Sequence, residues 1–422
     1  MSERPLTPAE RLLFELSRAA PSRARVEAAC REGGPGAFMD LQHHAMRHGI
    51  QGLVLHSLSR LQRDGVWPES REATDEALTR LRRQTLFWDM EQDRVLTGLG
   101  RAGFDPLVLK GGALRRGIFA PVERAMGDLD ILVRPDEVSG VLTSLAGLGY
   151  RSEYTDRARG EFLEHHHHDR VAHPAGFMVE VHWGLTRPYE AIRLDPERFL
   201  RRSIVLEAEG SPPIRVPRME DTLVHTVSQS EQDAVRGLRR LIDLDRLASL
   251  PDLDWDDVRT HADTVGLRGS LCVTLRLAQL CLGTEAPEDL ARGRGLTPAS
   301  RRAIAAMHPV RRLLEEPERG EAADFHLFRL WCARPDHRDH WLRTCLVGSG
   351  DPLHWVWLGE EDPEVEDERT TGLGFLLKLA LYQSILSLAN LRTRIRQSDD
   401  GGPGFWPSAD APDAHPTIQD DP

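Results

Sequence analysis

Residues 107–133, LVLKGGALRRGIFAPVERAMGDLDILV, contain the pattern on which the fold assignment of this 422-residue chain rests. One apolar run ends at Lys110 and two glycines, and a second carries Asp128 and Asp130 at alternating positions. Short apolar runs bounded by glycine predict β-strands, and residues two apart in a strand project from the same face. The pattern therefore predicts two strands joined by a helical segment, with two carboxylates side by side on the second strand.

The two aspartates carry the same charge at short range. When both are ionised, Asp128 and Asp130 repel each other, so the pair is costly unless a positive group lies between them. Oxygen ligands of this kind suit a hard divalent cation such as Mg²⁺. The alternative is an exposed edge strand whose polar face happens to be acidic. Two aspartates at this spacing do not by themselves decide between the two interpretations.

The segment after the first strand predicts an anion site. Gly111 and Gly112 allow backbone N–H groups to approach a phosphate, and the N-terminus of the following helix favours negative charge. Lys110 is one of two lysines among 54 basic residues, and its compact ammonium suits a phosphate at close range. The alternative is an ordinary strand-to-helix turn. Arg124 is expected either to bind phosphate or to neutralise Asp128.

A third carboxylate lies farther along the chain. The run FMVEVHW, residues 177–183, places Glu180 between two valines, with His182 on the same strand face. A carboxylate within an apolar strand needs a polar partner. If this strand lies beside the strand of Asp128, Glu180 completes a set of three metal-binding carboxylates, as in a two-metal phosphoryl-transfer site. His182 is then the candidate for a substrate or supporting contact.

Taken together, these motifs resemble the DNA polymerase β-type nucleotidyltransferase superfamily, and more narrowly a group of bacterial nucleotidyltransferase family proteins that is poorly characterised. The likeness spans roughly residues 35–285. The motifs that carry it are Lys110-Gly111, Arg124 with Gly127-Asp128-Leu129-Asp130, and Glu180-Val181-His182-Trp183.

The resemblance implies a fold, a cofactor and a set of site residues. The fold is an α+β or α/β core with a small mixed sheet, similar to that of polymerase β. The cofactor is Mg²⁺, with Mn²⁺ as the other option, held by Asp128, Asp130 and Glu180. The nucleotide is an NTP, with ATP the first choice, and the residues implied to hold its phosphates are Lys110, Gly111, Gly112 and Arg124.

Four consecutive histidines, His165 to His168, precede the Glu180 strand. Four neighbouring side chains cannot all reach one ion from an extended strand, so the run does not predict a zinc site made by all four. One of them, with His167 as the candidate, is expected on a strand antiparallel to residues 177–183. There it would reach the site as a base or substrate contact. The alternative is an exposed hairpin.

A second pair of aspartates, Asp243 and Asp245, lies in a helical pattern, LRRLIDLDRLASL. Residues two apart on a helix diverge, so this pair is not expected to bind one metal. Asp243 is expected to form a structural ion pair with Arg239 or Arg240.

Helical patterns flank the core on both sides. Apolar spacing of three to four residues predicts an N-terminal helical domain over 1–100, the core over 101–210 and a C-terminal helical domain over 211–396. Residues 285–370 are charged and rich in proline, and we expect them to be irregular. The acidic tail, residues 397–422, is expected to be disordered.

Composition narrows the function classes further. The formal net charge of −12 gives no general footprint for duplex nucleic acid. The sequence has no 18-residue apolar run, so no membrane span is expected. The N-terminus lacks the pattern of a signal peptide, and the five cysteines are scattered without metal-ligand spacing. These features predict a cytoplasmic protein.

We therefore expect Mg²⁺-dependent transfer of a nucleoside monophosphate from an NTP to an acceptor, which is a small molecule, a peptide or a protein. Two alternatives stay open. One is a phosphotransferase on the same fold, and the other is a non-catalytic nucleotide-binding partner in a biosynthetic assembly. The sequence does not indicate the acceptor or the oligomeric state.

Overall fold

A computed structural model describes residues 5–152, 166–186, 194–208, 210–232, 235–294, 296–306, 310 and 313–314. Two predictions lie outside these residues: the last part of the C-terminal helical domain, up to residue 396, and the disordered acidic tail.

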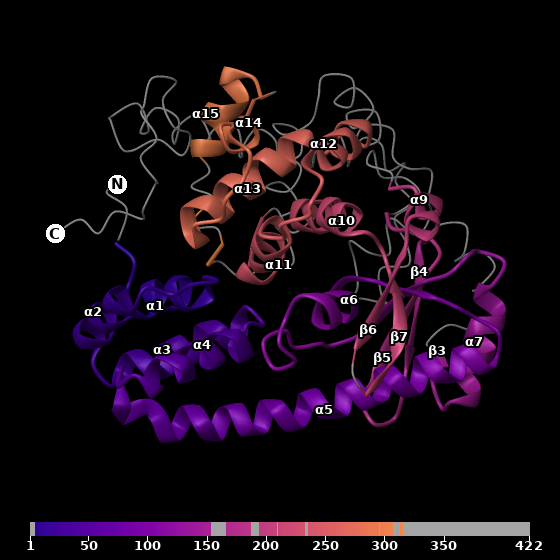
Figure 1. The fold of residues 1–422 in the computed structure, drawn as a ribbon, viewed down its shortest axis with the longest axis horizontal. Coiled ribbons are helices and arrows are strands. Elements are labelled where there is room, and N and C mark those ends of the chain that lie inside the picture. The colour runs from indigo at the N-terminus through magenta and orange to yellow at the C-terminus, as the bar shows by residue number, and fades with distance from the viewer. Residues whose placement is uncertain are drawn as a thin grey trace, which may run out of the picture.

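Four helices form the N-terminal part of the molecule: α1 (Pro8–Ser17), α2 (Arg23–Gly33), α3 (Gly36–Arg47) and α4 (Gln51–Arg63). α1 begins at a capping box, in which the Thr7 hydroxyl accepts the Glu10 N–H at 3.2 Å and the Glu10 carboxylate accepts the Thr7 N–H at 2.7 Å. A short 3-10 turn, η1 (Pro68–Ser70), leads into the long helix α5 (Arg71–Arg101). α5 runs along one side of the molecule from the N-terminal helices to the sheet (Figure 1).

A single seven-stranded sheet forms the core, in the order β3-β4-β5-β2-β1-β7-β6. Its strands are β1 (Leu107–Val108), β2 (Leu129–Leu132), β3 (Arg151–Ser152), β4 (His168–Ala172), β5 (Met178–His182), β6 (Ile204–Ala208) and β7 (Ser211–Val216). β2 pairs in parallel with β5, and β1 pairs in parallel with β7, whereas the other neighbours are antiparallel. The mixed sheet confirms the predicted mixed α/β class.

Four of the seven strands follow the apolar runs of the sequence, and three do not. β7 contains two adjacent prolines, Pro212 and Pro213, which weaken a strand pattern because proline cannot donate to the ladder. β7 forms a hairpin with the edge strand β6 across Gly210, whose φ is 78°. The sheet therefore continues to Val216, past residue 210, where we expected the core to end.

Helices connect and cover the strands. α6 (Lys110–Gly117) follows β1, α7 (Val138–Gly147) follows β2, and α9 (Pro196–Arg201) precedes β6. The C-terminal helices are α10 (Met219–Gln232), α11 (Leu238–Ala248), α12 (Trp255–Thr264) and α13 (Arg268–Leu282), all in the region predicted to be helical. Two further helices, α14 (Glu288–Ala291) and α15 (Pro298–Ala306), lie in the region we expected to be irregular, which corrects that expectation. Their buried Leu290 and Ile304 join the core and account for the difference.

Apolar side chains gather in two clusters on opposite faces of the sheet. Leu129 and Ile131 of β2 join α5 and α7 in one cluster, whereas Leu132 joins the other. This second cluster also contains Leu12 of α1 and Leu271 of α13, so helices from both ends of the described chain share one core. The domain boundaries at residues 100 and 210 thus stay predictions. Among the described residues, Cys30, Cys272 and Cys281 are buried free thiols.

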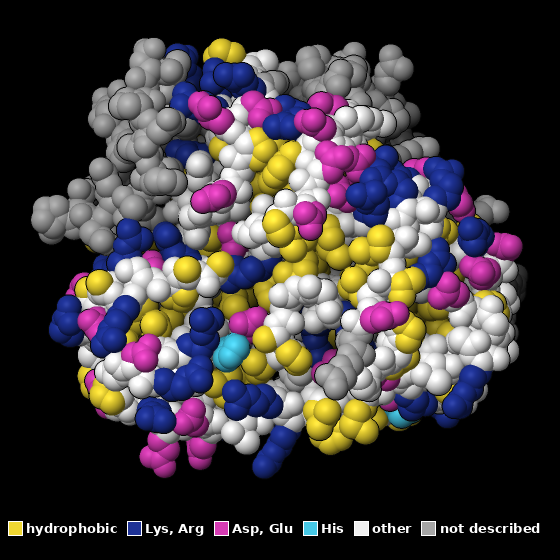
Figure 2. Space-filling view, viewed as in Figure 1, with side chains coloured by type: hydrophobic (Ala, Val, Ile, Leu, Met, Phe, Trp, Pro, Cys, Tyr) yellow, Lys and Arg dark blue, Asp and Glu magenta, His cyan; other side chains and the backbone are white. Residues whose placement is uncertain are grey.

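The surface carries charges of both signs. On the face shown in Figure 2, Lys and Arg side chains are interspersed with Asp and Glu side chains. No helix within the described part of the chain is both long and apolar enough to cross a membrane.

Gly52 allows a close approach that positions the loop before β2. A Cβ atom at this position in α4 would lie 1.8 Å from the carbonyl oxygen of Val122. We expect Gly52→Ala to lower the free energy of unfolding by at least about 2 kcal/mol, because two backbones would have to separate. The matched control is Gly100→Ala in α5, where an added Cβ meets nothing within 4 Å. It should raise stability by about 0.5–1 kcal/mol through helix propensity. Denaturant unfolding measures both, and equal stability of the two variants would contradict this account.

Candidate functional site

The parallel pairing of β2 with β5 brings the predicted carboxylates together. Asp130 and Glu180 are register partners on adjacent strands. β2 is flanked by β1 and β5, and Asp130 and Glu180 are only 3% and 9% exposed. The alternative of an exposed acidic edge strand is therefore wrong. Two buried carboxylates at this separation require a compensating charge.

Lys110 supplies that charge. Its ammonium donates to the Asp130 carboxylate and lies 3.6 Å from Glu180 Oε2. Burial lowers the pKa of Lys110, but the charges of Asp130 and Glu180 outweigh it and raise the pKa above its usual value. The backbone of Lys110 is left-handed, with φ of 47°, which costs a non-glycine residue about 1–2 kcal/mol. The fold thus keeps a charged lysine in a strained position at the start of α6.

His182 is the fourth member of this cluster. Its Nε2 lies 3.0 Å from Asp130 Oδ1 and 3.4 Å from Glu180 Oε2. Burial raises the pKa of Asp130, but the charge of Lys110 and the hydrogen bond from His182 lower it far below its usual range. Burial also raises the pKa of Glu180, and the same two partners lower it, so both carboxyl groups are ionised. An ionised carboxylate only accepts hydrogen bonds, so His182 Nε2 carries a proton and donates it.

Asp128 differs from the other two carboxylates. It is half-buried and lies just before β2. Burial raises its pKa, and the charges of Asp130 and Glu180 raise it further, while Lys110 and Arg239 offset only part of this effect. Asp128 is therefore the carboxylate whose ionisation has the least compensation.

The donor set fits a hard divalent cation. One ligand atom each from Asp130, Glu180 and His182 lie within 4.8 Å of one another. Carboxylate oxygens are the ligands that Mg²⁺ and Mn²⁺ prefer, and Asp128 adds another from the same strand face. Asp128, Asp130 and Glu180 could hold such an ion, with His182 beside them, and its charge would offset the repulsion that raises the pKa of Asp128.

A cavity of about 320 Å³ lies beside the carboxylates, between the start of α6 and the helices α10 and α11. Six cationic residues line it, against three acidic ones. The cationic residues are Arg47, Lys110, Arg124, Arg236, Arg239 and Arg240, and the acidic ones are Asp128, Asp130 and Asp243. Burial lowers the pKa of both Arg239 and Arg240 to about 10, so both stay charged near neutral pH. This balance favours an anionic ligand.

Two polar stripes form the wall of the cavity opposite the carboxylates, and our sequence reasoning did not identify them as site residues. One consists of Thr222, His225, Thr226 and Gln229 on α10, and the other of Arg236, just before α11, with Arg239, Arg240 and Asp243 on α11. Both sets follow the spacing i, i+3, i+4, i+7, which marks one face of a helix. That spacing is a signal by which they could have been found. Burial and the nearby Lys110 charge lower the pKa of His225 to about 3, so its imidazole is neutral near pH 7.

Arg124 is paired with Asp243, a partner that the sequence did not predict for Arg124. Its Nε and Nη2 donate to Asp243 Oδ1 and Oδ2, each at 2.8 Å, and both side chains are buried. The expectation that Arg124 binds phosphate or neutralises Asp128 stays a prediction, as does the pairing of Asp243 with Arg240, whose charge interacts with that carboxylate. Arg239 donates to the Ala125 carbonyl at 2.6 Å. The pair of Arg124 and Asp243 arises because α11 turns Asp243 toward the loop before β2, a contact between residues far apart in sequence.

The two glycines of α6 occupy different environments. Gly111 lines the cavity beside Lys110. Gly112 instead faces the sheet, where an added Cβ would lie 2.8 Å from Val108 Cγ1 and 3.3 Å from Leu129 Cδ1. Packing alone accounts for glycine at this position. Phosphate binding by Gly112 stays a prediction.

Two histidines of the run lie next to His182. The expected antiparallel strand is present as β4, and His168 is the register partner of His182. His167 Nε2 lies 3.2 Å from His168 Nδ1, and both residues are half-buried. Burial and the neighbouring His182 lower the pKa of His168 to about 3. His167 is not among the residues that line the cavity, and its substrate contact stays a prediction.

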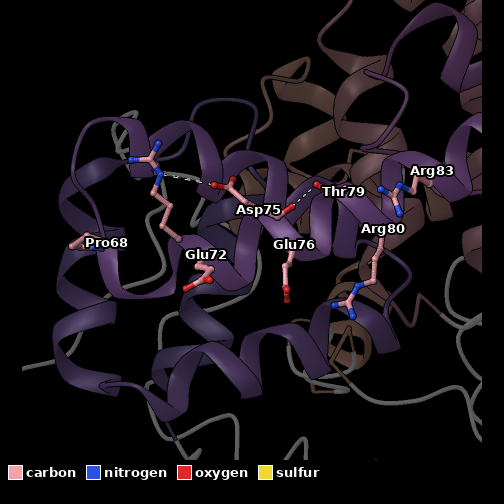
Figure 3. Close-up of a pocket in the computed structure, with 8 residues that line it drawn as sticks. Pro68, Glu72, Asp75, Glu76, Thr79, Arg80 and Arg83 are labelled. Atoms are coloured by element: carbon pink, nitrogen blue, oxygen red, sulfur yellow. Dashed lines mark hydrogen bonds and ion pairs between the residues drawn. The ribbon is translucent and has the colours of Figure 1, made fainter.

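A larger hollow of about 760 Å³ lies along the start of α5, away from this cluster (Figure 3). All eight residues that line it are exposed, and Arg71 and Asp75 form an ion pair across one helical turn at 3.9 Å. The labelled side chains follow the helix without converging on one point. Since none of its lining residues is buried, this hollow lacks the positioned groups that a reaction requires, and the smaller cavity is the candidate site.

The opposite pKa shifts of Asp128 and Asp130 predict opposite effects of substitution. A raised folded-state pKa means that ionised Asp128 costs stability above its unfolded pKa of about 3.9. Asp128→Asn should therefore raise the thermal midpoint at pH 7, and the gain should disappear below about pH 4. Asp130 has a lowered pKa, so its ionised form stabilises the fold at neutral pH. Asp130→Asn should cost about 3–5 kcal/mol at pH 7, because Lys110 loses the nearer of its two carboxylate partners. Thermal melts across pH measure both, and a shift of the same sign for both variants at pH 7 would contradict this assignment.

The buried Arg124–Asp243 pair predicts strong coupling between the core and α11. Arg124→Met should cost about 3–5 kcal/mol, because a buried carboxylate loses its partner. The double variant Arg124→Met/Asp243→Leu should be more stable than either single variant, since no buried charge is left unpaired. Glu27→Ala, which removes a pair with Arg23 that lies largely at the surface, is the control and should cost at most about 1 kcal/mol. Additive losses in the double variant would show that the pair is not coupled.

The family comparison agrees with this geometry. A family model described as an uncharacterised nucleotidyltransferase matches residues 37–283, which is more than half of the 422 residues. The matched region includes all the carboxylates of the cluster, Lys110, and the helices α10 and α11 that form the opposite wall. No curated protein and no solved structure matches the chain. The chain therefore belongs to this family of uncharacterised nucleotidyltransferases, as the motifs predicted.

Proposed function

We propose that the protein transfers a nucleoside monophosphate from an NTP, with ATP as the first candidate, to an acceptor hydroxyl, phosphate or protein side chain. The observation that carries the proposal is the pairing of Asp130 with Glu180 beside a cavity in which cationic side chains outnumber acidic ones. Carboxylates next to a cationic cavity separate two tasks, because oxygen ligands bind a divalent cation while arginine and lysine bind phosphate.

Asp128, Asp130 and Glu180 are the proposed metal ligands. A divalent cation held by them supplies charge stabilisation to the reacting phosphate and the leaving pyrophosphate. The carboxylates also serve as proton acceptors close to the attacking group, so no separate base is required. His182 holds Asp130 and Glu180 in place through Nε2.

Lys110 and Gly111 are the proposed phosphate-binding residues at the start of α6. The first N–H groups of a helix have no partner within the helix, and the helix dipole favours an anion there. Gly111 places this helix end on the cavity, and Lys110 adds a full positive charge. Lys110 contacts both Asp130 and Glu180, so it keeps these carboxylates neutralised until phosphate and cation bind.

The arginines at the start of α11 are the proposed contacts for the outer phosphates or for an anionic acceptor. Arg239 and Arg240 stay charged and line the wall opposite Lys110. At about 320 Å³ the cavity is near the lower end of the range of roughly 300–1,000 Å³ for small-ligand sites, so a nucleotide would occupy most of it. The acceptor would then approach along α10, where Thr222, Thr226 and Gln229 offer uncharged polar groups.

The test is to incubate the full-length protein with Mg²⁺, a native extract and ATP labelled at either the α- or the γ-phosphate. Nucleotidyl transfer should place the α-label on an acceptor and release pyrophosphate. Transfer of the γ-label would instead identify the phosphotransferase. If neither label is transferred and no metal-dependent nucleotide binding occurs, the protein is not an enzyme of this class. Nucleotide binding that survives without transfer indicates the non-catalytic partner.

Substitutions connect the transfer to the cluster. Asp130→Asn and Glu180→Gln should each lower the rate at least about 100-fold, because each removes a proposed ligand. The matched control is Asp136→Asn, an exposed aspartate in the turn after β2, which should keep the wild-type rate. Equal losses in all three variants would show that the effect does not arise from the carboxylate cluster.

A further inference from the structure

Three histidines converge on the side of the cluster formed by β4. His167 and His168 lie at the start of β4, and His182 lies opposite them at the end of β5. Their ring centroids are 4.5 Å apart for His167 and His168, 5.0 Å for His168 and His182, and 5.8 Å for His167 and His182. One ring nitrogen from each lies within 4.8 Å of the other two. This histidine trio is a set of donors distinct from the three carboxylates.

The spacing of the nitrogens suits a tetrahedral metal. Zinc–nitrogen bonds of about 2.0–2.1 Å place the ligand nitrogens about 3.3 Å from each other. His167 Nε2 and His168 Nδ1 are already 3.2 Å apart. The remaining separations need to shorten by at most about 1.5 Å, from 4.8 Å, which side-chain rotation can provide.

His182 is oriented as a metal ligand. Its Nε2 donates to Asp130, so in the neutral imidazole the lone pair resides on Nδ1. This Nδ1 is buried and has no hydrogen-bond partner among the residues that the structure describes. A buried nitrogen without a partner is costly unless something else binds it. Metal-binding histidines commonly donate their second ring N–H to a carboxylate, which fixes the tautomer.

We propose that His167, His168 and His182 bind a divalent transition metal of the zinc class, at a site separate from the oxygen ligands proposed for Mg²⁺. Imidazole nitrogens select such ions, whereas carboxylates select harder ones. The inference goes beyond the proposed transfer reaction. Because Nε2 of His182 already donates to Asp130, its Nδ1 would be the ligand atom, and an ion bound there would fix the proton on Nε2 and so hold Asp130 in place.

The test measures metal content in the full-length protein after chelator treatment and dialysis against Zn²⁺. The wild-type protein should retain one equivalent, and His168→Ala should weaken binding at least about 10-fold. His173→Asn is the matched control, because His173 lies on the same β4–β5 hairpin but outside the trio, and it should retain the ion. Asp128→Asn should also retain it. A wild-type protein that binds no Zn²⁺, or a His168→Ala variant that binds it as well as the wild type, overturns the proposal.

A second measurement covers the case in which His168→Ala fails to fold. In His168→Cys the thiolate is itself a good zinc-class ligand, so binding should persist. With Co²⁺ as the probe, this variant should gain a thiolate-to-metal charge-transfer band that the wild type lacks. Absence of that band in a folded His168→Cys variant overturns the proposal. Loss of Zn²⁺ from Asp128→Asn would likewise overturn it by placing the ion on the carboxylates. Both readouts are independent of transfer activity, so the proposed function can fail while this inference holds, and the reverse.

Discussion

The repulsion between carboxylates on two adjacent parallel strands is the constraint on which the rest of the site depends. The register of β2 and β5 places Asp130 beside Glu180 in a buried position, where neither carboxylate can rely on water. The fold answers with one ammonium and one imidazole, from Lys110 and His182. Bringing Lys110 into place requires a left-handed residue at the start of α6. Since a strained backbone persists only where surrounding contacts hold it, the ion pair and the position of α6 stabilise each other.

This arrangement compensates the negative charges of Asp130 and Glu180 and leaves Asp128 with a raised pKa. The remaining cations are on the opposite wall, where Arg239 and Arg240 face the cavity from α11. Arg124 belongs to the loop before β2 and donates to Asp243 of α11 through Nε and Nη2. This pair fixes the distance between the carboxylates and the α11 side of the cavity. The site is therefore a product of two regions that lie far apart in sequence. Its shape depends on the buried ion pair between Arg124 and Asp243. The described hydrogen bonds of Arg124 go to Asp243 and to the Ala125 carbonyl, not to Asp128 or Asp130.

The sequence predicted those features whose cause is local. Alternation along residues 128–133 and 177–183 located the three carboxylates, and a helical period of three to four residues predicted that the region of α10 to α13 is helical. The sequence did not predict β6 and β7, because Pro212 and Pro213 argue against a strand while the parallel partner β1 lies about a hundred residues earlier. The partner of Arg124 was also missed. Several arginines near Asp243 satisfy the same local pattern, and only tertiary packing decides among them. The polar residues of α10 and α11 that line the cavity could have been predicted from helical periodicity, since they recur at the spacing of one helix face.

The position of His182 depends on strand alternation and on both kinds of strand pairing. Strand alternation puts it on the face of Glu180, parallel pairing brings it to Asp130, and antiparallel pairing brings it to His168. A lysine or arginine at this position would neutralise the carboxylates but would offer no lone pair to a neighbour. An asparagine could donate its amide N–H to a carboxylate, but its free carbonyl oxygen suits harder cations than those of the zinc class. A neutral imidazole can donate to an ionised carboxylate through one nitrogen while the other nitrogen stays available as a ligand for such an ion. The chemistry of this residue, more than its burial, explains why a histidine closes the cluster.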